Sequence, residues 1–159
     1  MLLAPVTPSD VDALRSFLGE ADLTLAGLEA PGVRLWVERD PDGVIVGSTG
    51  FELSADGRHA LIRSVAVAQD RRTAGAGSRL ARFALDAARG AGAERAWLFS
   101  RRSGPFWQKL GFAAADRDQL ASVLAGSHQV ELFRSTGQLG REVAWSLALA
   151  EHVDATATA

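Results

Sequence analysis

The stretch from residue 60 to residue 89 constrains the fold more than any other part of the chain. The apolar run 60–67 has the length and composition of a buried strand. A turn of the pattern Arg-x-x-Gly-x-Gly follows, with Arg72, Gly75 and Gly77 at the fixed positions, and an alanine-rich run over about 75–89 then has helical spacing. Glycines let a ligand approach the backbone, and a helix start presents unpaired N–H groups, so this segment suits a diphosphate.

The segments before this turn predict a hairpin and a third strand. Residues 33–38 alternate apolar and polar side chains, 40–43 have turn composition, and 44–53 read as the next strand. A second turn at 55–57 leads to a strand over 59–67, so we expect three consecutive antiparallel strands.

The N-terminal residues predict a short strand over 2–6 and then a helix. Thr7 is suited to cap that helix, Pro8 to its first position, and Asp10 to the third residue after the cap. Residues 20–31 are ambiguous, and we expect a second short helix there.

The C-terminal half predicts further strands and helices. We expect strands at 95–100, 111–115 and 142–149, helices at 105–110 and 118–124, and a frayed tail at 151–159. The chain is therefore predicted to be an α+β domain over 1–150, with a mixed, mostly antiparallel sheet and helices on both faces.

The composition narrows the range of partners and sites that the chain can have. The chain of 159 residues has a net charge of −2, which does not favour nucleic acid or a membrane surface as a partner. It has no cysteine, which rules out a cysteine nucleophile and thiolate metal ligands, and we expect no metal site. Neither a signal peptide nor a run of transmembrane length is recognisable, so we expect a cytoplasmic protein.

Taken alone, the glycine turn also fits an ordinary connection between a strand and a helix. Two other phosphate-binding motifs do not match. A nucleotide P-loop needs Lys after its last glycine, where Ser78 stands, and a dinucleotide fingerprint needs a small residue where Leu80 stands.

The order of elements and two motifs together resemble the GNAT family of acyl-CoA-dependent N-acetyltransferases. The first motif is the strand ending Val65-Ala66-Val67 with the turn 72–77, and the second is the segment 106–112, Phe-Trp-Gln-Lys-Leu-Gly-Phe. Within the family the chain looks most similar to the arsenic-resistance N-acetyltransferases, on the segments 50–53, 61–67 and 116–136.

The resemblance implies that acetyl-CoA lies between the strand ending at Val67 and the strand ending at Ser100. The backbone of Val65 and Val67 is expected to bind the pantetheine arm, and the N–H groups of the turn the diphosphate. The residues implied in acetyl-CoA binding are Val65, Ala66, Val67, Arg71, Arg72, Thr73, Ala74, Gly75, Ala76, Gly77 and Ser100.

The same resemblance implies amine attack on a thioester, with Glu52 as the base that acts through water. The alternative for Glu52 is a solvent-facing strand residue paired with Arg63. Arg63 is otherwise expected, with Ser64, to bind the substrate, since guanidinium grips carboxylates in a bidentate manner. The chain has no tyrosine, and Trp107 stands where relatives often carry a tyrosine acid. The proton for the departing thiolate is then expected from Ser100, water or solvent.

The expected function is acetyl transfer from acetyl-CoA to a small amine, which is amino-acid-like, phosphinothricin-like or an amino-arsenical. Two alternatives are a catalytically silent acyl-CoA-binding or regulatory domain of the same fold and a structural interaction domain. The last strand, 142–149, is apolar and is expected to pair or pack with a second copy in a homodimer.

Overall fold

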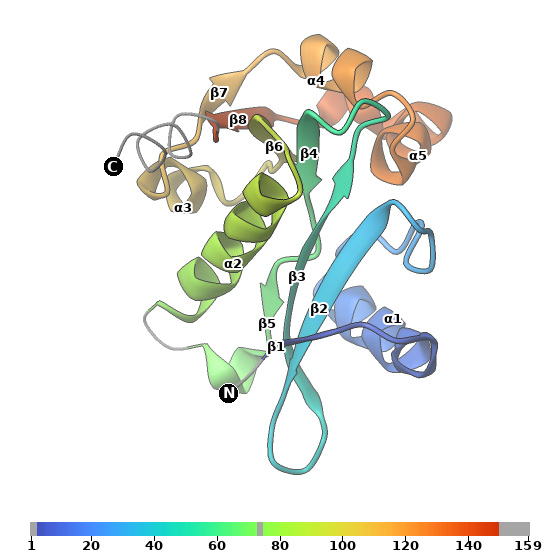
Figure 1. Ribbon diagram of the computed structural model, residues 1–159, viewed down its shortest axis with the longest axis vertical. Coiled ribbons are helices and arrows are strands. Elements are labelled where there is room, and N and C mark those ends of the chain that lie inside the picture. The colour runs from blue at the N-terminus through green and yellow to red at the C-terminus, as the bar shows by residue number, and fades with distance from the viewer. Residues whose placement is uncertain (1–2, 73–74, 150–159) are drawn as a thin grey trace. The chain divides into compact units, whose positions relative to one another are not determined.

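The computed structural model describes residues 3–72 and 75–149 of the chain (Figure 1). These residues form two compact units. The first unit contains the chain up to Glu52 together with Ile62–Ala84, and the second contains Leu53–Leu61 and the residues from Leu85 onward. Among the described residues, no helix has the length and apolar composition needed to cross a membrane.

The first unit is built on four strands that pair in antiparallel fashion. Strand β2 pairs with β1 on one edge and with β3 on the other, and β3 also pairs with β5. Its elements are β1 (Leu3–Pro5), the 3-10 turn η1 (Pro8–Asp10), α1 (Val11–Glu20), β2 (Val33–Arg39), β3 (Ile45–Leu53), β5 (Ala66–Val67), η2 (Gln69–Arg71) and the beginning of α2 (Ala76–Gly90).

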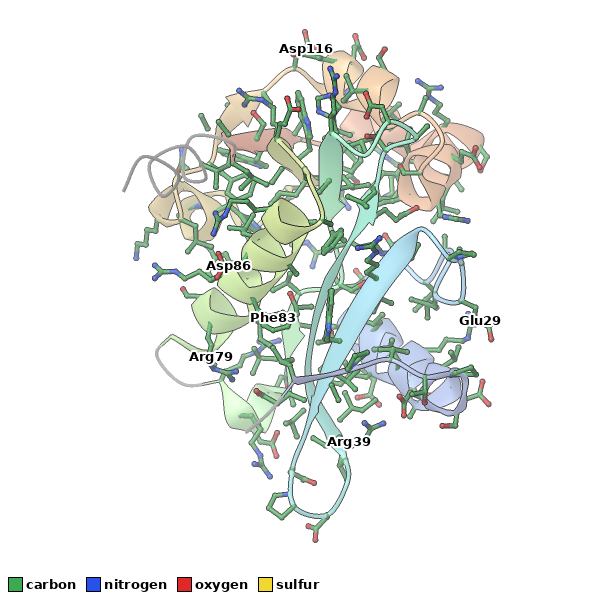
Figure 2. The ribbon with its side chains drawn as sticks, viewed as in Figure 1. Glu29, Arg39, Arg79, Phe83, Asp86 and Asp116 are labelled. Carbon is green, nitrogen blue, oxygen red and sulfur yellow. The ribbon has the colours of Figure 1, made fainter. Side chains whose placement is uncertain are left out.

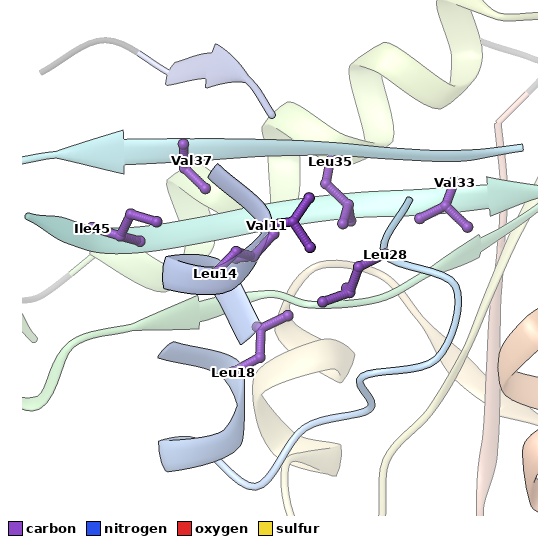
Figure 3. Close-up of a cluster of buried hydrophobic side chains, with 8 residues drawn as sticks. All are labelled: Val11, Leu14, Leu18, Leu28, Val33, Leu35, Val37 and Ile45. Carbon is purple, nitrogen blue, oxygen red and sulfur yellow. The ribbon is translucent and has the colours of Figure 1, made fainter. Parts of the chain in front are cut away.

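Helix α1 covers one face of this sheet, as its helical spacing predicts. Leu14 and Leu18 of α1 are completely buried and belong to one cluster with apolar side chains of β2 and β3, such as Leu35 and Ile45 (Figure 3). Side chains alternate along a strand, so Trp36, next to Leu35, points to the opposite face. There it meets Phe83 of α2 edge-on, with 5.1 Å between the ring centroids. Helices thus lie on both faces of the sheet in this unit.

The second unit contains four paired strands. Strand β4 runs parallel to β6, β6 is antiparallel to β8, and β8 is antiparallel to β7. Its elements are β4 (His59–Ile62, the last residue belonging to the first unit), the end of α2, β6 (Arg95–Phe99), α3 (Gly104–Lys109), β7 (Ala113–Ala115), α4 (Arg117–Val123), α5 (His128–Thr136), η3 (Gln138–Arg141) and β8 (Ala144–Ala148). Leu61 and Trp97 pack with Leu120 of α4 and Val130 of α5 in its core.

The predicted α+β class and its mostly antiparallel strands are confirmed, but two local predictions are wrong. Residues 20–31 form turns and no second helix, because Asp22 adopts a left-handed φ of 58° directly after α1. The strand expected over 59–67 is interrupted between β4 and β5. Helix α5 was not predicted. Strand β8 pairs with β6 on one edge and with β7 on the other, and the expected homodimer stays a prediction.

Candidate functional site

A break in the predicted strand 59–67 shapes the first part of the site. Ser64 adopts a left-handed φ of 61°, which is uncommon for a residue other than glycine. The Ser48 hydroxyl donates to the Ser64 carbonyl at 2.6 Å, and the Arg63 N–H donates to the Gly50 carbonyl at 2.9 Å. After the break, β5 pairs with β3 through Ala66 opposite Ser48 and Val67 opposite Gly47.

One edge of β5 remains open within its unit. Strand β3 occupies the other edge, and no further described strand of the first unit pairs with β5. An open edge carries N–H and C=O groups that an extended ligand can use as a further strand does. The Arg72 side chain already reaches back to this strand, with Nε donating to the Val67 carbonyl at 3.2 Å.

The described end of the turn before α2 has the conformation that Gly75 permits. Gly75 has a φ of 87°, in the left-handed region, and an added Cβ there would meet no atom within 4 Å. Helix α2 begins at Ala76, and the first N–H groups of a helix have no partner within it. Thr73 and Ala74, which were also predicted to bind acetyl-CoA, lie outside the described residues.

Two arginines tie the turn and the start of α2 to the β2–β3 hairpin. Arg79 of α2, labelled in Figure 2, makes a bidentate pair with the buried Glu38 of β2, with N···O distances of 2.7 and 2.8 Å. The hydrogen bonds to Glu38 raise the pKa of Arg79. Arg71 lies 3.3 Å from the Asp40 carboxylate. No local pattern in the sequence indicates the pair between Arg79 and Glu38.

A cavity of about 530 Å³ lies where β5 ends, within the first unit. Its lining combines apolar side chains with three carboxylates and one guanidinium. The lining residues are Phe17, Glu20, Ala21, Asp40, Val44, Ile45, Val46, Val67, Ala68, Gln69, Asp70 and Arg72. The predicted binding residues Val67 and Arg72 are thus brought to one cavity.

Glu52 lies near the other end of β3, and it is buried. Its side chain is 3% exposed, and its Oε2 accepts from Nη1 of Arg63 at 2.9 Å. The alternative of a pair with Arg63 is therefore what the structure has, but the carboxylate does not face solvent. Arg63 is itself buried, and its guanidinium is engaged within the protein, which speaks against its predicted contact with a substrate carboxylate. Ser64 is buried as well.

The distance along β3 separates these two groups of residues. Gly47, opposite Val67, and Glu52 are five residues apart in an extended strand, which corresponds to about 17 Å at 3.3 Å per residue. The Glu52 carboxylate thus lies near one end of β3. The open strand β5, the cavity and the glycine turn lie toward the other end of β3. A ligand that used both ends would have to be long and extended.

Ser100 belongs to the second unit and directly follows β6. Its Oγ accepts the Ser103 N–H at 3.0 Å, and its carbonyl accepts from the Trp145 indole at 3.0 Å. Ser103 is the N-cap residue of α3, although its side chain makes no capping hydrogen bond. Trp107 is buried in α3, with Phe106 and Phe112 edge-on to its ring.

A model of the "Acetyltransferase (GNAT) family" matches residues 6–112, about two thirds of the chain. No curated protein sequence shows a significant match. Among the described residues, no group of three or more His, Asp or Glu side chains is arranged to hold a metal ion.

Solved structures share the fold at low sequence identity. An N-acetylglutamate synthase from Neisseria gonorrhoeae, complexed with coenzyme A and N-acetyl-glutamate, matches with a TM-score of 0.68 and 21% identity, over 94% of this chain and 35% of that one. An acetyltransferase of the GNAT family from Staphylococcus aureus Mu50 matches with a TM-score of 0.67 and 13% identity, over 93% and 99% of the two chains. A nourseothricin acetyltransferase matches with a TM-score of 0.61 and 19% identity, over 93% and 98%. The chain thus spans about a third of the length of the synthase.

Proposed function

Since the chain belongs to the acetyltransferase (GNAT) family, whose members are acyl-CoA-dependent N-acetyltransferases, we propose that its acceptor is the amine of a small, amino-acid-like molecule. The observation that carries the proposal is the open strand β5 leading into the glycine turn and the start of α2. Its similarity in fold to a synthase that was solved with coenzyme A and N-acetyl-glutamate makes amino acids the first acceptors to test.

The acetyl-CoA site extends from β5 to the start of α2. The backbone of Val65, Ala66 and Val67 holds the pantetheine arm along the open edge, as an added strand does. The turn from Arg72 to Gly77, with Thr73, Ala74, Gly75 and Ala76, holds the diphosphate by its N–H groups. Arg71 adds positive charge next to the turn.

The cavity at the end of β5 receives the uncharged part of the arm that adjoins the diphosphate. Apolar residues such as Phe17, Val46 and Val67 line it beside Arg72. Its carboxylates disfavour a phosphate group inside the cavity itself, which leaves the diphosphate at the turn. The extended arm then runs along β5 in the direction of the break at Ser64.

The chemistry is acetyl transfer to nitrogen. The neutral amine attacks the thioester carbonyl, so that an N–C bond forms and the C–S bond breaks. The amine loses one proton and the departing thiolate gains one. Glu52 takes the amine proton through water, and Arg63 donates to its carboxylate at 2.9 Å.

The proton for the departing thiolate comes through Ser100, which takes a proton from water as it gives up its own, or directly from solvent. The Ser100 Oγ accepts the Ser103 N–H, which orients the hydroxyl and leaves its own proton for donation. The buried Trp107 offers only an indole N–H, which is no useful acid.

Two more specific candidates for the acceptor are phosphinothricin-like amino acids and amino-arsenicals. Trivalent arsenic prefers thiolate ligands, and the chain has no cysteine, so an arsenical would be held by its amino-acid end. The alternative function is a catalytically silent acyl-CoA-binding domain, which the absence of tyrosine favours.

The test is thiol release from acetyl-CoA in the presence of single amines. The panel contains glutamate, other amino acids, phosphinothricin, amino-phenyl arsenicals and polyamines. We expect release that depends on one acidic or amino-acid-like amine. Acetyl-CoA binding without release by any amine would favour the silent domain, and release with polyamines alone would contradict the acceptor class.

A further inference from the structure

Arg63 is the most deeply buried charge that the proposed chemistry does not use directly. Its side chain has no exposed surface, and its guanidinium contacts three separate segments of the first unit. Nη1 donates to Glu52 Oε2 of β3 at 2.9 Å, Nη2 to the Thr24 carbonyl between α1 and β2 at 3.2 Å, and Nε to Ser64 Oγ at the strand break at 3.3 Å.

Stability alone is a poor reason for this arrangement. Burial of an ion pair costs several kcal/mol of desolvation per ion, and apolar residues of similar volume often serve stability as well or better. Burial lowers the pKa of Arg63, and the neighbouring Glu52 acts in the opposite direction. The Arg63 guanidinium is buried despite this cost, and its three contacts lie on different segments. It is therefore well suited to fixing the positions of these segments relative to one another.

The backbone around Arg63 also restricts where its side chain can lie. Ser64 is held in its left-handed conformation while its carbonyl accepts from Ser48, and the Arg63 N–H is held by the Gly50 carbonyl. An alanine at position 50 would not fit, since an added Cβ would lie 2.3 Å from the Arg34 carbonyl oxygen. The strand break thus fixes the backbone of Arg63. The planar guanidinium of Arg63 in turn fixes the Glu52 carboxylate.

We propose that Arg63 is a positioning residue, whose guanidinium fixes the Glu52 carboxylate for proton transfer and ties the segment between α1 and β2 to that carboxylate. This inference rests on the proposed function, in which Glu52 is the base. It replaces the predicted contact between Arg63 and the substrate. Lysine at this position retains the charge but lacks the fork, so it cannot reproduce the three contacts.

The test is a double-mutant cycle on the full chain with the amine that supports thiol release. Arg63→Lys and Arg63→Met are made alone and together with Glu52→Gln, and kcat, the KM for acetyl-CoA and thermal unfolding are measured. We expect kcat to fall by about tenfold for the lysine and about a hundredfold for the methionine variant, as for a misplaced catalytic group. The KM for acetyl-CoA stays within about twofold, since the turn is remote.

The cycle separates positioning from a structural role. In the Glu52→Gln background, Arg63→Met is expected to cause no further loss of kcat, because its effect passes through the carboxylate. The control is Arg39→Lys, which alters the partly exposed pair with Asp10 and should leave kcat unchanged. Should Arg63→Met fail to fold, Arg63→Lys carries the test, and the double variant removes the Glu52 carboxylate together with the guanidinium.

Three outcomes overturn the inference. Full kcat in Arg63→Lys and Arg63→Met, with loss in Glu52→Gln, refutes the positioning role and leaves the proposed function intact. Equal losses in both backgrounds mean that Arg63 acts independently of Glu52. Parent-like kcat in Glu52→Gln refutes the base itself and, with it, the inference.

Discussion

The two ends of the β3–β5 region differ in how they present polar groups. At the end near Glu52, the charges are buried and paired with each other, and a strained backbone holds them. At the end near Gly75, the polar groups are backbone N–H and C=O groups on an open strand edge and a helix start, with partly exposed arginines around them. The first end is suited to fixing one carboxylate, and the second to receiving a ligand. Substitutions at the two ends should therefore separate turnover from acetyl-CoA affinity.

The largest expected effect is on turnover, from Glu52→Gln. Removal of a general base typically costs about 10²–10⁴ in rate, so kcat should fall by at least about a hundredfold. Acetyl-CoA affinity, measured by calorimetry, should change by less than about twofold because the turn is untouched. If Glu52→Gln had the kcat of the parent protein, the end near Glu52 would have no separate role in turnover.

A smaller effect on affinity is expected from Glu38→Gln. The amide cannot make the charge-assisted bidentate pair with Arg79, so the start of α2 loses its anchor to β2. We expect the Kd for acetyl-CoA to rise about tenfold and stability to fall by about 1–2 kcal/mol in urea unfolding. The matched control is Glu94→Gln, whose exposed pair with Arg58 should contribute less than about 1 kcal/mol. Equal effects of the two substitutions would contradict the anchor.

Ala21→Phe tests whether the cavity belongs to the acetyl-CoA site. The larger side chain fills space that the arm is proposed to occupy, so the Kd for acetyl-CoA should rise about fivefold, equivalent to ~1 kcal/mol. Ala13→Phe, on the exposed face of α1, is the control and should leave the Kd unchanged. An unchanged Kd in both variants would place the ligand outside this cavity.

The smallest effect concerns the start of α1 and its dependence on pH. The Thr7 N–H and hydroxyl, and then Arg39, lower the pKa of Asp10 in the folded protein. A lowered folded pKa stabilises the protein above the unfolded pKa, and this contribution is lost as the pH falls below about 4. Asp10→Asn should therefore cost about 1 kcal/mol at pH 7 and nothing at pH 2. Asp12→Asn, at an exposed position, is the control. A loss of stability in Asp10→Asn that is the same at pH 7 and pH 2 would contradict the account.

The local signals in the sequence were sufficient for most of the elements. The cap at Thr7 with Asp10, the helix after Gly75 and the hairpin around Gly43 all depend on residues close together in the chain, and the structure has them where they were predicted. Such features follow from backbone and capping preferences, which short windows of sequence express.

The features that the sequence did not reveal depend on residues far apart. The break at Ser64 requires a left-handed serine held by Ser48, and no residue preference indicates it. The Arg79–Glu38 pair joins residues 41 positions apart. The burial of Glu52 likewise arises from the tertiary fold, and the sequence offered its pair with Arg63 only as an alternative.

The most direct measurement is a calorimetric titration of the parent protein and of Gly75→Glu with acetyl-CoA. The account predicts binding by the parent and a Kd at least about a hundredfold higher in the variant, because the new carboxylate repels the diphosphate and strains a left-handed position. Gly57→Glu, at another open glycine with a positive φ, is the matched control and should bind as the parent does. No binding by the parent, or equal binding by Gly75→Glu, would contradict the assignment of the turn as the acetyl-CoA site.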